Sequence, residues 1–189
     1  MAINSYYPVP ELEEYAERFK EFFKFKRENG ILEVQMHTKG GPVKWSYQMH
    51  HALAELWTVI GHDKKNEVLI LTSSGDKWIN EWDVESFKEV EQSPDDDQRY
   101  DVQIYDTLKI VENFVNDIEI PTIAAINGPC AGMAVPIALA CDLRYASESA
   151  VFTTAFSQRG LVAEWGVAWM LPRLIGTANA LDLLFSARK

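Results

Sequence analysis

The chain has 189 residues, with 28 acidic and 18 basic side chains and a net charge of −10 at pH 7. This length suits one domain with a sizeable core, and we expect a single domain over residues 1–189. The acidic balance argues against general nucleic-acid binding, and the lack of a membrane-length apolar run argues against a membrane partner. With two cysteines and no signal peptide, we expect a reducing cytoplasm.

The N-terminal segment predicts a helix followed by a hairpin. Apolar residues at helical spacing among many charges predict an amphipathic helix over residues 10–22, packed at the edge of the domain. Residues 23–27 and 31–36 alternate in polarity on either side of an Asn-Gly pair, which predicts two hairpin strands.

The next segment predicts a loop over residues 37–44 and then a helix. Ser46 is a good N-cap for a helix that runs to about Ile60. His50 shares an apolar stripe of this helix with Trp57, so it is either a packed core histidine or a proton carrier. The other histidines are expected on the surface or in turns: His37, His51 and His62.

The middle of the chain continues the alternation of strand and helix. Residues 68–72 form a short apolar run typical of a buried strand, and residues 73–76 make a polar turn. Residues 77–98 are mixed, and the acidic run at 93–97 is interpreted as a solvated loop rather than a metal site. A further helix, ending before Pro121, is predicted from five apolar residues at helical spacing: Val102, Tyr105, Leu108, Val111 and Val115.

Residues 120–144 predict a strand, a tight turn, a helix and a strand. The turn at 127–133 holds Gly128 and Gly132. A glycine lets a backbone approach a ligand closely, and the N–H groups that open the next helix attract negative charge. Such a turn can hold a phosphate or an oxyanion. No G-x-G-x-x-G or G-K-[ST] pattern follows a strand, and no H-E-x-x-H spacing indicates a metal. Cys130 is interpreted as a plain buried cysteine rather than a reactive thiol.

The remainder predicts short strands and loops, a helix over residues 166–171 that Pro172 interrupts, and another helix over 178–187. The repeated order of strand, helix and strand, with buried strands, predicts an α/β layered domain.

The residues AAINGPCAGMAVPIALACDLRYASESAVF, followed by RGLV and PRLIG, resemble the crotonase superfamily, also called the enoyl-CoA hydratase/isomerase family. The resemblance is strong over residues 68–189. It implies an α/β fold built as a spiral of ββα units, a homotrimer or hexamer, and two backbone N–H groups that stabilise an enolate oxygen. We also expect the C-terminal helical segment of the family to be truncated in this chain.

The resemblance assigns roles to individual positions. The two oxyanion donors fall on the backbone N–H groups of Trp82 and Met133. The two glutamates of the hydratases fall on Pro136 and Phe156, neither of which can move a proton, so ordinary hydration by that pair is not expected. The positions expected to contact substrate are Asn80, Gly132, Phe156 and Trp165.

Glu164 matches the position of the single catalytic base in some isomerases of the family. One carboxylate suffices to carry a proton between two carbons of an enolised acyl group. Its apolar neighbours Val162 and Trp165 would raise its pKa toward the range of a base. Alternatively, Glu164 caps the helix that begins near Gly166.

A second resemblance, within the family, concerns Trp45, His50 and the NEWD run that begins at Asn80. These residues are similar to 6-oxocamphor hydrolase and related β-diketone hydrolases. The resemblance implies that Trp45 and His50 lie in the active site, with His50 paired to a carboxylate that Glu164 would supply. Met133 departs from the subgroup, which has a second histidine at about that position.

We therefore predict an enolate-forming enzyme, with retro-Claisen hydrolysis of a cyclic β-diketone ahead of enoyl-CoA isomerisation. A catalytically inactive assembly subunit with the same fold is the third interpretation. The expected partner is a small-molecule substrate, without nucleic acid or membrane. No metal or bound cofactor is expected, because a CoA thioester would be a substrate here.

Overall fold

The structure is a computed structural model that describes residues 9–79, 81–91 and 106–189. Three predictions fall outside the described residues: Asn80 as a substrate contact, the acidic loop at 93–97, and the beginning of the helix predicted from Val102 and Tyr105. Within the described part of the chain, no helix is both long and apolar enough to cross a membrane.

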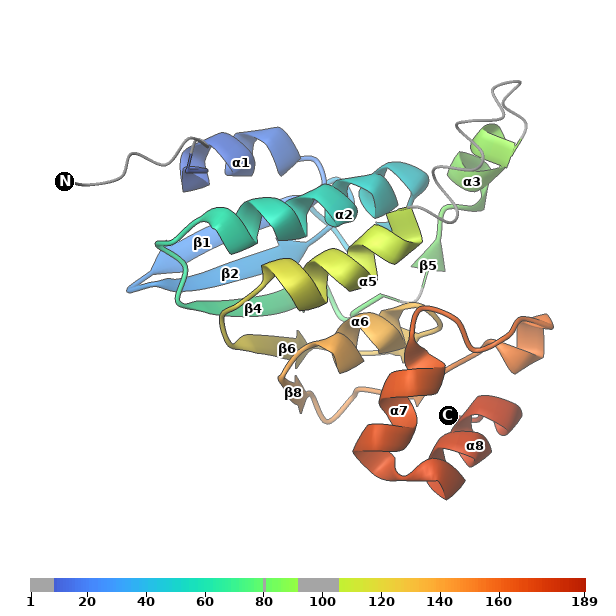
Figure 1. Ribbon diagram of the computed structural model, residues 1–189. Coiled ribbons are helices and arrows are strands. Elements are labelled where there is room, and N and C mark those ends of the chain that lie inside the picture. The colour runs from blue at the N-terminus through green and yellow to red at the C-terminus, as the bar shows by residue number, and fades with distance from the viewer. Residues whose placement is uncertain (1–8, 80, 92–105) are drawn as a thin grey trace.

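A five-stranded sheet forms the main layer (Figure 1). Its strands, in spatial order, are β1 (Phe23–Glu28), β2 (Ile31–Met36), β4 (Val68–Ser73), β6 (Thr122–Ile126) and β8 (Leu143–Ala146). Strands β1 and β2 form the predicted antiparallel hairpin, and every later strand joins its neighbour in parallel. Parallel neighbours require crossover connections, which the helices supply.

Four two-residue strands form a second set of pairs. Strand β3 (Lys44–Trp45) pairs in parallel with β5 (Glu81–Trp82), and β7 (Cys130–Ala131) pairs in parallel with β9 (Phe152–Thr153). Each short strand follows one strand of the main sheet along the chain. A long strand, a short strand and a helical segment therefore make one repeating unit, which is the expected spiral of ββα units.

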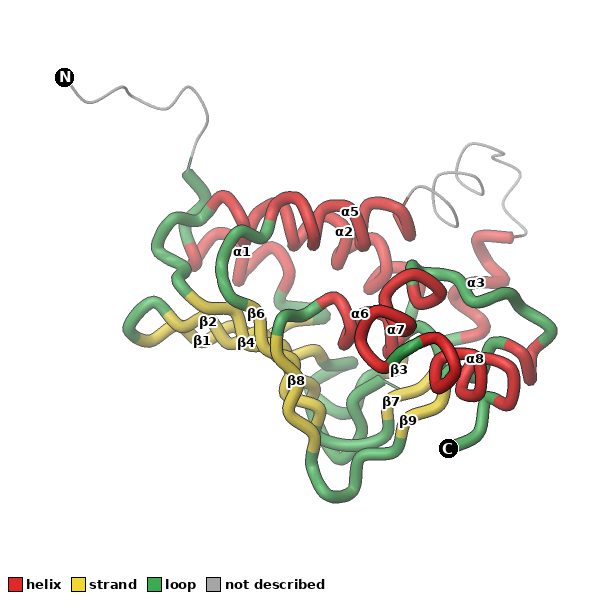
Figure 2. Tube along the Cα trace, turned by 60° about the horizontal axis from the view of Figure 1, so that its bottom comes forward, coloured by secondary structure: helices red, strands yellow, loops and turns green. Residues whose placement is uncertain are grey.

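Three helices cover one side of the main sheet, as Figures 1 and 2 show. They are α1 (Leu12–Phe19), α2 (Tyr47–His62) and α5 (Asp106–Asp117), and α2 packs along α5. Ser46 caps α2 as predicted, with its hydroxyl accepting a hydrogen bond from Met49 N–H at 3.1 Å. Helix α3 (Val84–Glu91) was not predicted, because residues 77–98 lack a clear apolar period.

The remaining helices gather beyond β6 and β8 (Figure 2). They are α6 (Ala134–Ala140), the 3₁₀ turn η2 (Ser157–Arg159), α7 (Val167–Ile175) and α8 (Thr177–Ser186). The predicted interruption at Pro172 is wrong, since α7 continues through it. Contacts with α6 and α8 outweigh the one backbone bond that a helical proline removes.

The core lies between the sheet and its helices. Strands β2, β4 and β6 alternate buried with partly exposed side chains, so only one face of the sheet is closed. On α2 the predicted stripe is buried, including His50 and Trp57. Among the residues of α5 whose burial the structure describes, Ile110 and Phe114 are buried, whereas Leu108, predicted to face the core, is exposed.

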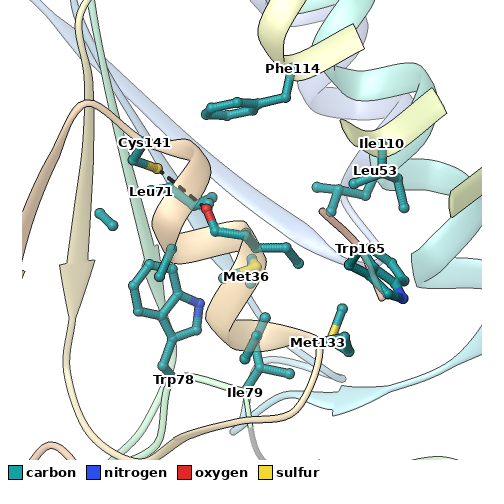
Figure 3. Packing of buried hydrophobic residues seen from close by; sticks show 14 of the residues in the cluster. Met36, Leu53, Leu71, Trp78, Ile79, Ile110, Phe114, Met133, Cys141 and Trp165 are labelled. Atoms are coloured by element: carbon teal, nitrogen blue, oxygen red, sulfur yellow. Dashed lines mark hydrogen bonds between the residues drawn. The ribbon is translucent and has the colours of Figure 1, made fainter. Parts of the chain in front are cut away.

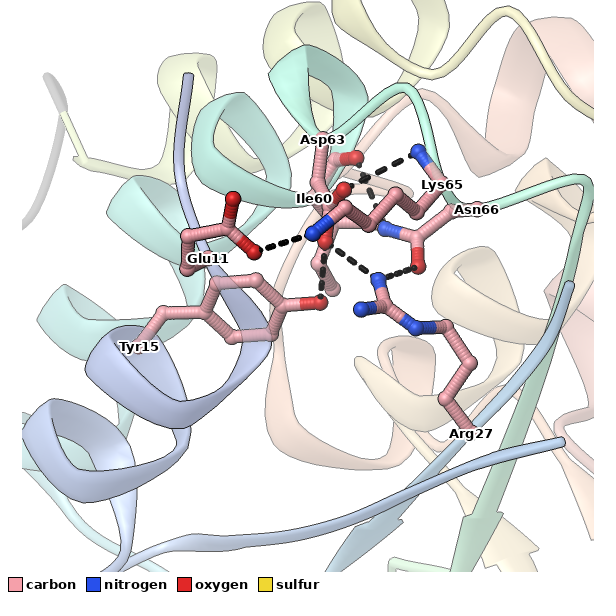
Figure 4. A network of polar contacts seen from close by, with 7 residues as sticks. All are labelled: Glu11, Tyr15, Arg27, Ile60, Asp63, Lys65 and Asn66. Atoms are coloured by element: carbon pink, nitrogen blue, oxygen red, sulfur yellow. Dashed lines mark hydrogen bonds and ion pairs between the residues drawn. The ribbon is translucent and has the colours of Figure 1, made fainter. Parts of the chain in front are cut away.

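A buried polar network ties α1 to the rest of the domain (Figure 4). The carboxylate of Asp63, whose side chain is fully buried, accepts hydrogen bonds from the Tyr15 hydroxyl at 3.1 Å and from Arg27. Asn66 accepts a second bond from Arg27 at 3.0 Å. Burial raises the pKa of Tyr15 far above its usual range, so the phenol remains a donor.

His37 lies in a turn, one of its two predicted places, but it is not on the surface. It is buried in the turn that follows β2, where its Nδ1 accepts the Gly40 N–H at 3.0 Å. Burial, with the nearby charge of Lys24 as the smaller cause, lowers the pKa of His37.

Candidate active site

Two backbone segments run side by side beyond the carboxyl ends of β4 and β6. The Trp78 N–H donates to the carbonyl of Pro129 at 3.0 Å, and the Ala131 N–H donates to the carbonyl of Ile79 at 3.1 Å. One segment leads into β5 and the other into α6. The fold thus brings together the two stretches of chain that carry the predicted oxyanion donors.

The turn after β6 is fixed by its side-chain amide and by its glycine. Asn127 Nδ2 donates to the carbonyls of Ser73 and Gly75, at 3.0 and 2.7 Å. A Cβ atom added at Gly128 would lie 1.9 Å from the carbonyl oxygen of Asp76. Gly128 therefore serves the close approach of two chain segments, and Gly132 is the glycine of the predicted turn that borders open space.

Gly132 has the properties that were expected of the turn glycine. Its φ is +59°, a conformation that favours glycine, and a Cβ placed there would meet no heavy atom within 4 Å. The next residue, Met133, is the N-cap of α6. The open space at Gly132 lies directly before the first N–H groups of this helix.

The Met133 N–H, predicted as an oxyanion donor, has no acceptor among the described residues. Its neighbours are used: Gly132 N–H donates to Thr153 and Val135 N–H donates to Gly132. Among the hydrogen bonds of the described residues, none has Met133 N–H as its donor. An N–H at the start of a helix lacks an intrahelical acceptor, so a ligand can accept its hydrogen bond.

The Trp82 N–H is oriented away from its partner strand. The next residue, Asp83, donates its N–H to the carbonyl of Trp45 at 2.7 Å. Because successive N–H groups of an extended strand point to opposite sides, the Trp82 N–H points away from β3. The indole of Trp82 is partly exposed and contacts the ring of Phe87 at 5.0 Å between centroids.

His50 is enclosed by three aromatic rings. The centroids of Trp45, Phe87 and Trp165 lie 6.1, 6.5 and 5.2 Å from that of the imidazole, with interplanar angles of 81°, 90° and 86°. The Nε2 atom is 3.3 Å from the hydroxyl oxygen of Thr107 on α5. His50 is only 4% exposed, so its environment is a closed aromatic cage with polar contact at Nε2.

Trp165 reaches this cage from a strained turn. Its φ is +56°, and Gly166 after it also has a positive φ of 72°. A bulky residue in this region costs about 1–3 kcal/mol, which its surroundings must offset. Figure 3 shows Trp165 beside Leu53 and Ile110 in the buried cluster. The turn thereby places the indole between α2, α5 and His50.

Glu164 lies next to Trp165 in sequence, but its side chain is exposed. Val162, expected to provide apolar surroundings, is 80% exposed, so the apolar pocket predicted for this carboxylate is absent from the described residues. Within those residues, no hydrogen bond or ion pair joins Glu164 to His50. The dyad of His50 and Glu164 stays a prediction, and the contact seen with His50 in this turn is that of Trp165.

Trp45 has a buried donor beside His50. Its side chain is fully buried, and its Nε1–H has no acceptor among the described residues. A buried N–H without a partner costs roughly 1–3 kcal/mol, so such groups call for an explanation. The indole N–H groups of Trp57 and Trp78 also lack an acceptor among the described residues, so what distinguishes Trp45 is its place beside His50.

Pro136 and Phe156 stand in apolar surroundings. Pro136 lines an apolar cavity of about 10 Å³ between α2, α5, α6 and α7, with Trp57 and Trp165 among its walls. Phe156 is buried just before η2. Neither position offers a group that can transfer a proton.

Two members of this site had no signal in the sequence. Phe87 lies on the unpredicted helix α3, and Thr107 is far from His50 along the chain. A threonine on a helix surface has no motif that distinguishes it from any other. Only the packing of α5 on α2 reveals the contact.

The cysteines take no part in this site. Both are free and buried, and burial raises the pKa of the Cys130 and Cys141 thiols to about 12. They are therefore protonated near neutral pH, as the interpretation of Cys130 as a plain buried cysteine requires. In the part of the chain that the structure describes, no group of three or more His, Cys, Asp or Glu side chains could hold a metal ion.

Comparisons with known proteins agree with this architecture. The sequence model of one family, described as enoyl-CoA hydratase/isomerase, matches residues 26–189. A solved β-diketone hydrolase from the cyanobacterium Anabaena sp. PCC 7120, bound to (S)-3-oxocyclohexyl acetic acid, superposes with a TM-score of 0.81 and 32% identity. That match covers 97% of this chain and 70% of the hydrolase.

Isomerases are among the curated relatives. The peroxisomal Δ(3,5)-Δ(2,4)-dienoyl-CoA isomerase of Arabidopsis thaliana is 34% identical over 128 residues, which is 65% of this chain and 46% of the relative. The 1,2-epoxyphenylacetyl-CoA isomerase of Escherichia coli is 30% identical over 164 residues, covering 86% of this chain and 62% of the relative. The chain thus spans about half the length of the curated relatives it matches.

Three observations agree on the family. They are the spiral of ββα units, the paired segments before β5 and α6, and a family match over nearly the whole chain. The protein belongs to the enoyl-CoA hydratase/isomerase family, the crotonase superfamily.

Proposed function

We propose that this protein holds an enolate between the backbone N–H groups of Trp82 and Met133 and uses it to hydrolyse a carbon–carbon bond of a cyclic β-diketone. The observation that carries the proposal is the pairing of Trp45 with His50. A buried indole N–H without an acceptor among the described residues lies in the same cage as a histidine. The indole N–H of Trp45 can hold a carbonyl oxygen, while His50 accepts a proton from water.

The reaction consumes one water and needs no external oxidant. His50 takes a proton from water, and the water oxygen bonds to one carbonyl carbon of the diketone. The bond between that carbon and the carbon linking the two carbonyls then breaks. Its electron pair forms an enolate, whose oxygen the Trp82 and Met133 N–H groups stabilise. The proton held by His50 returns to carbon, which gives a ketone and a carboxylic acid.

The ligand of the similar hydrolase supports the choice of substrate class. The molecule 3-oxocyclohexyl acetic acid carries a ketone and a carboxylic acid, the two groups that addition of water to a 1,3-diketone leaves. The ketone has two neighbouring ring carbons, and one of them lies opposite the carbon that bears the side chain. Joining the carboxyl carbon to that opposite carbon, with loss of water, gives a bridged bicyclic 1,3-diketone. This diketone is the first substrate to test.

Isomerisation of an acyl-CoA is the second candidate. It is supported by the two isomerases among the relatives and by the accessible carboxylate of Glu164. In that reaction Glu164 would remove a proton from one carbon of the enolised acyl group and return it to another, without consuming water. Relatives named as probable enoyl-CoA hydratases also match the chain. Hydration by two glutamates is not proposed, because Pro136 and Phe156 stand where the family resemblance places those glutamates.

Parallel assays separate the two functions. The purified protein is incubated with the bicyclic 1,3-diketone and, separately, with an enoyl-CoA, and the products are followed by mass spectrometry. We expect a keto acid heavier than the diketone by one water and no change in the enoyl-CoA. Isomerised enoyl-CoA with intact diketone would establish the isomerase instead. Turnover of neither substrate, with a partner protein copurifying, would indicate an inactive assembly subunit.

A homotrimer or hexamer in a reducing cytoplasm also belongs to this proposal. The family resemblance supports the assembly, and the two free cysteines fit a reducing compartment. Light scattering coupled to size-exclusion chromatography measures the assembly, and a monomeric mass would contradict it.

A further inference from the structure

We propose that Thr107 is a positioning residue that sets the tautomer of His50. The proposal rests on the function proposed for His50 as a base. Its evidence is the 3.3 Å contact between Thr107 Oγ1 and His50 Nε2, made across the packed pair of helices α2 and α5. In a neutral imidazole one nitrogen carries the proton and the other accepts, so a fixed partner at one nitrogen decides which is which.

The three rings around His50 restrict its orientation. Each meets the imidazole nearly at a right angle, at 81°, 86° and 90°. Edge contacts of this kind fill the space around the ring, so that turning the imidazole over would displace Trp45, Phe87 or Trp165. The rings thus fix the plane of His50, and Thr107 distinguishes its two nitrogens.

A hydroxyl suits a base that must both take and return a proton. In the favoured tautomer Thr107 accepts from Nε2–H, which leaves Nδ1 bare to take a proton from water, and the same hydrogen bond is kept once Nδ1 is protonated. Thr107 adds no charge, so it does not hold the imidazolium as a carboxylate would. His50 can then release its proton to the enolate carbon at the end of the reaction.

The same pair of helices contains a matched control. Thr58 lies about two helical turns beyond His50 on α2. Its hydroxyl donates to Asp117 at 2.6 Å and accepts from Asn113 at 3.1 Å, both on α5. Thr58→Val removes a hydroxyl from the same helix pair without removing the contact to His50.

The test compares Thr107→Val, Thr107→Ser and Thr58→Val with the unmodified protein labelled with ¹⁵N-histidine. In the unmodified protein the ring-nitrogen shifts of His50 should show one dominant tautomer. Thr107→Val should give a mixture, whereas Thr107→Ser and Thr58→Val should keep the single tautomer. With diketone, Thr107→Val should lower kcat by about tenfold to a hundredfold with little change in KM, and Thr107→Ser should restore most of it.

Two results would overturn the proposal. One is an even mixture of His50 tautomers in the unmodified protein, and this measurement does not depend on the folding of any variant. The other is a Thr107→Val protein with unchanged His50 shifts and unchanged kcat. Lack of diketone turnover by the unmodified protein would instead overturn the proposed function, and the nitrogen shifts would still decide the role of Thr107.

Discussion

The indole of Trp165 meets the imidazole of His50 nearly edge-on, with ring centroids 5.2 Å apart, while the neighbouring Glu164 side chain is exposed. His50 is thus held by aromatic and hydroxyl groups, and the carboxylate stands outside the cage. The two residues should therefore differ in their importance for diketone cleavage.

We expect His50→Ala to lower kcat on the bicyclic 1,3-diketone by about 10²–10⁴-fold, the range for loss of a general base. Glu164→Gln should cost less than about tenfold, because the described structure contains no bond between its carboxylate and His50. Steady-state kinetics of both variants, with circular dichroism to confirm folding, measures this difference. Equal and complete loss in both would establish the dyad instead.

Removal of the Met133 N–H tests the oxyanion hole directly. Met133 has φ near −62° and precedes the first turn of α6, a place where proline is tolerated. Met133→Pro should lower kcat by about 10²–10³-fold, the usual effect of losing one oxyanion donor. Met133→Leu, which keeps the N–H and a similar volume, is the control. If the folded proline variant matched the leucine variant in kcat, the Met133 N–H would have no catalytic role.

The two glycines beside the site should respond differently to alanine. In Gly128→Ala the new methyl group would lie 1.9 Å from the Asp76 carbonyl oxygen, so two backbone segments must separate. We expect a loss of at least about 3 kcal/mol in the free energy of unfolding, at the large end for single substitutions. Gly132→Ala meets open space and should cost only about 1 kcal/mol, from its positive φ. Urea denaturation ranks the two, and the reverse order would contradict the packing of this turn.

His37 should make the fold sensitive to mild acid. Burial, followed by the charge of Lys24, lowers its folded-state pKa below the ordinary value of 6.5. The folded state therefore binds fewer protons than the unfolded state, and the stabilising contribution, full above pH 6.5, is lost as pH falls through the folded pKa. Protonation of Nδ1 also removes the acceptor for Gly40 N–H.

His37→Asn should reduce the loss of unfolding free energy below about pH 6.5, where one group contributes at most about 1.4 kcal/mol per pH unit. Lys24→Gln should reduce it to a smaller extent, since that charge is the lesser cause. Urea midpoints measured across this pH range decide the matter. An unchanged slope in His37→Asn would assign the acid sensitivity to other groups.

Local patterns predicted much of the framework. Ser46 at the start of α2, the hairpin of β1 and β2, and the existence of strands β4 and β6 follow from capping, alternation or short apolar runs. The continuous apolar runs of β4 and β6 predicted burial on both faces, which is wrong, since each strand fully buries only one face. The two-residue strands could not be predicted, because two residues show no period. Pairing across the spiral defines β3 and β5, and that pairing orients the Trp82 N–H.

The site was predicted less completely than the fold. The family resemblance indicated Trp45 and His50, and the structure brings these two together. It could not indicate Thr107 or Phe87, whose contacts with His50 arise from the packing of α5 and α3. Apolar surroundings were expected for Glu164 because Val162 lies two residues before it in the sequence. Hydrophobic neighbours along a turn need not be buried, and Val162 is exposed.

Isotope incorporation during turnover of the bicyclic 1,3-diketone tests the central claim most directly. In H₂¹⁸O the new carboxylate should contain one ¹⁸O, and in D₂O the carbon between the original carbonyls should gain one deuterium, because water adds and an enolate is protonated. Deuterium exchange into the diketone without carbon–carbon cleavage or ¹⁸O uptake would contradict the hydrolase.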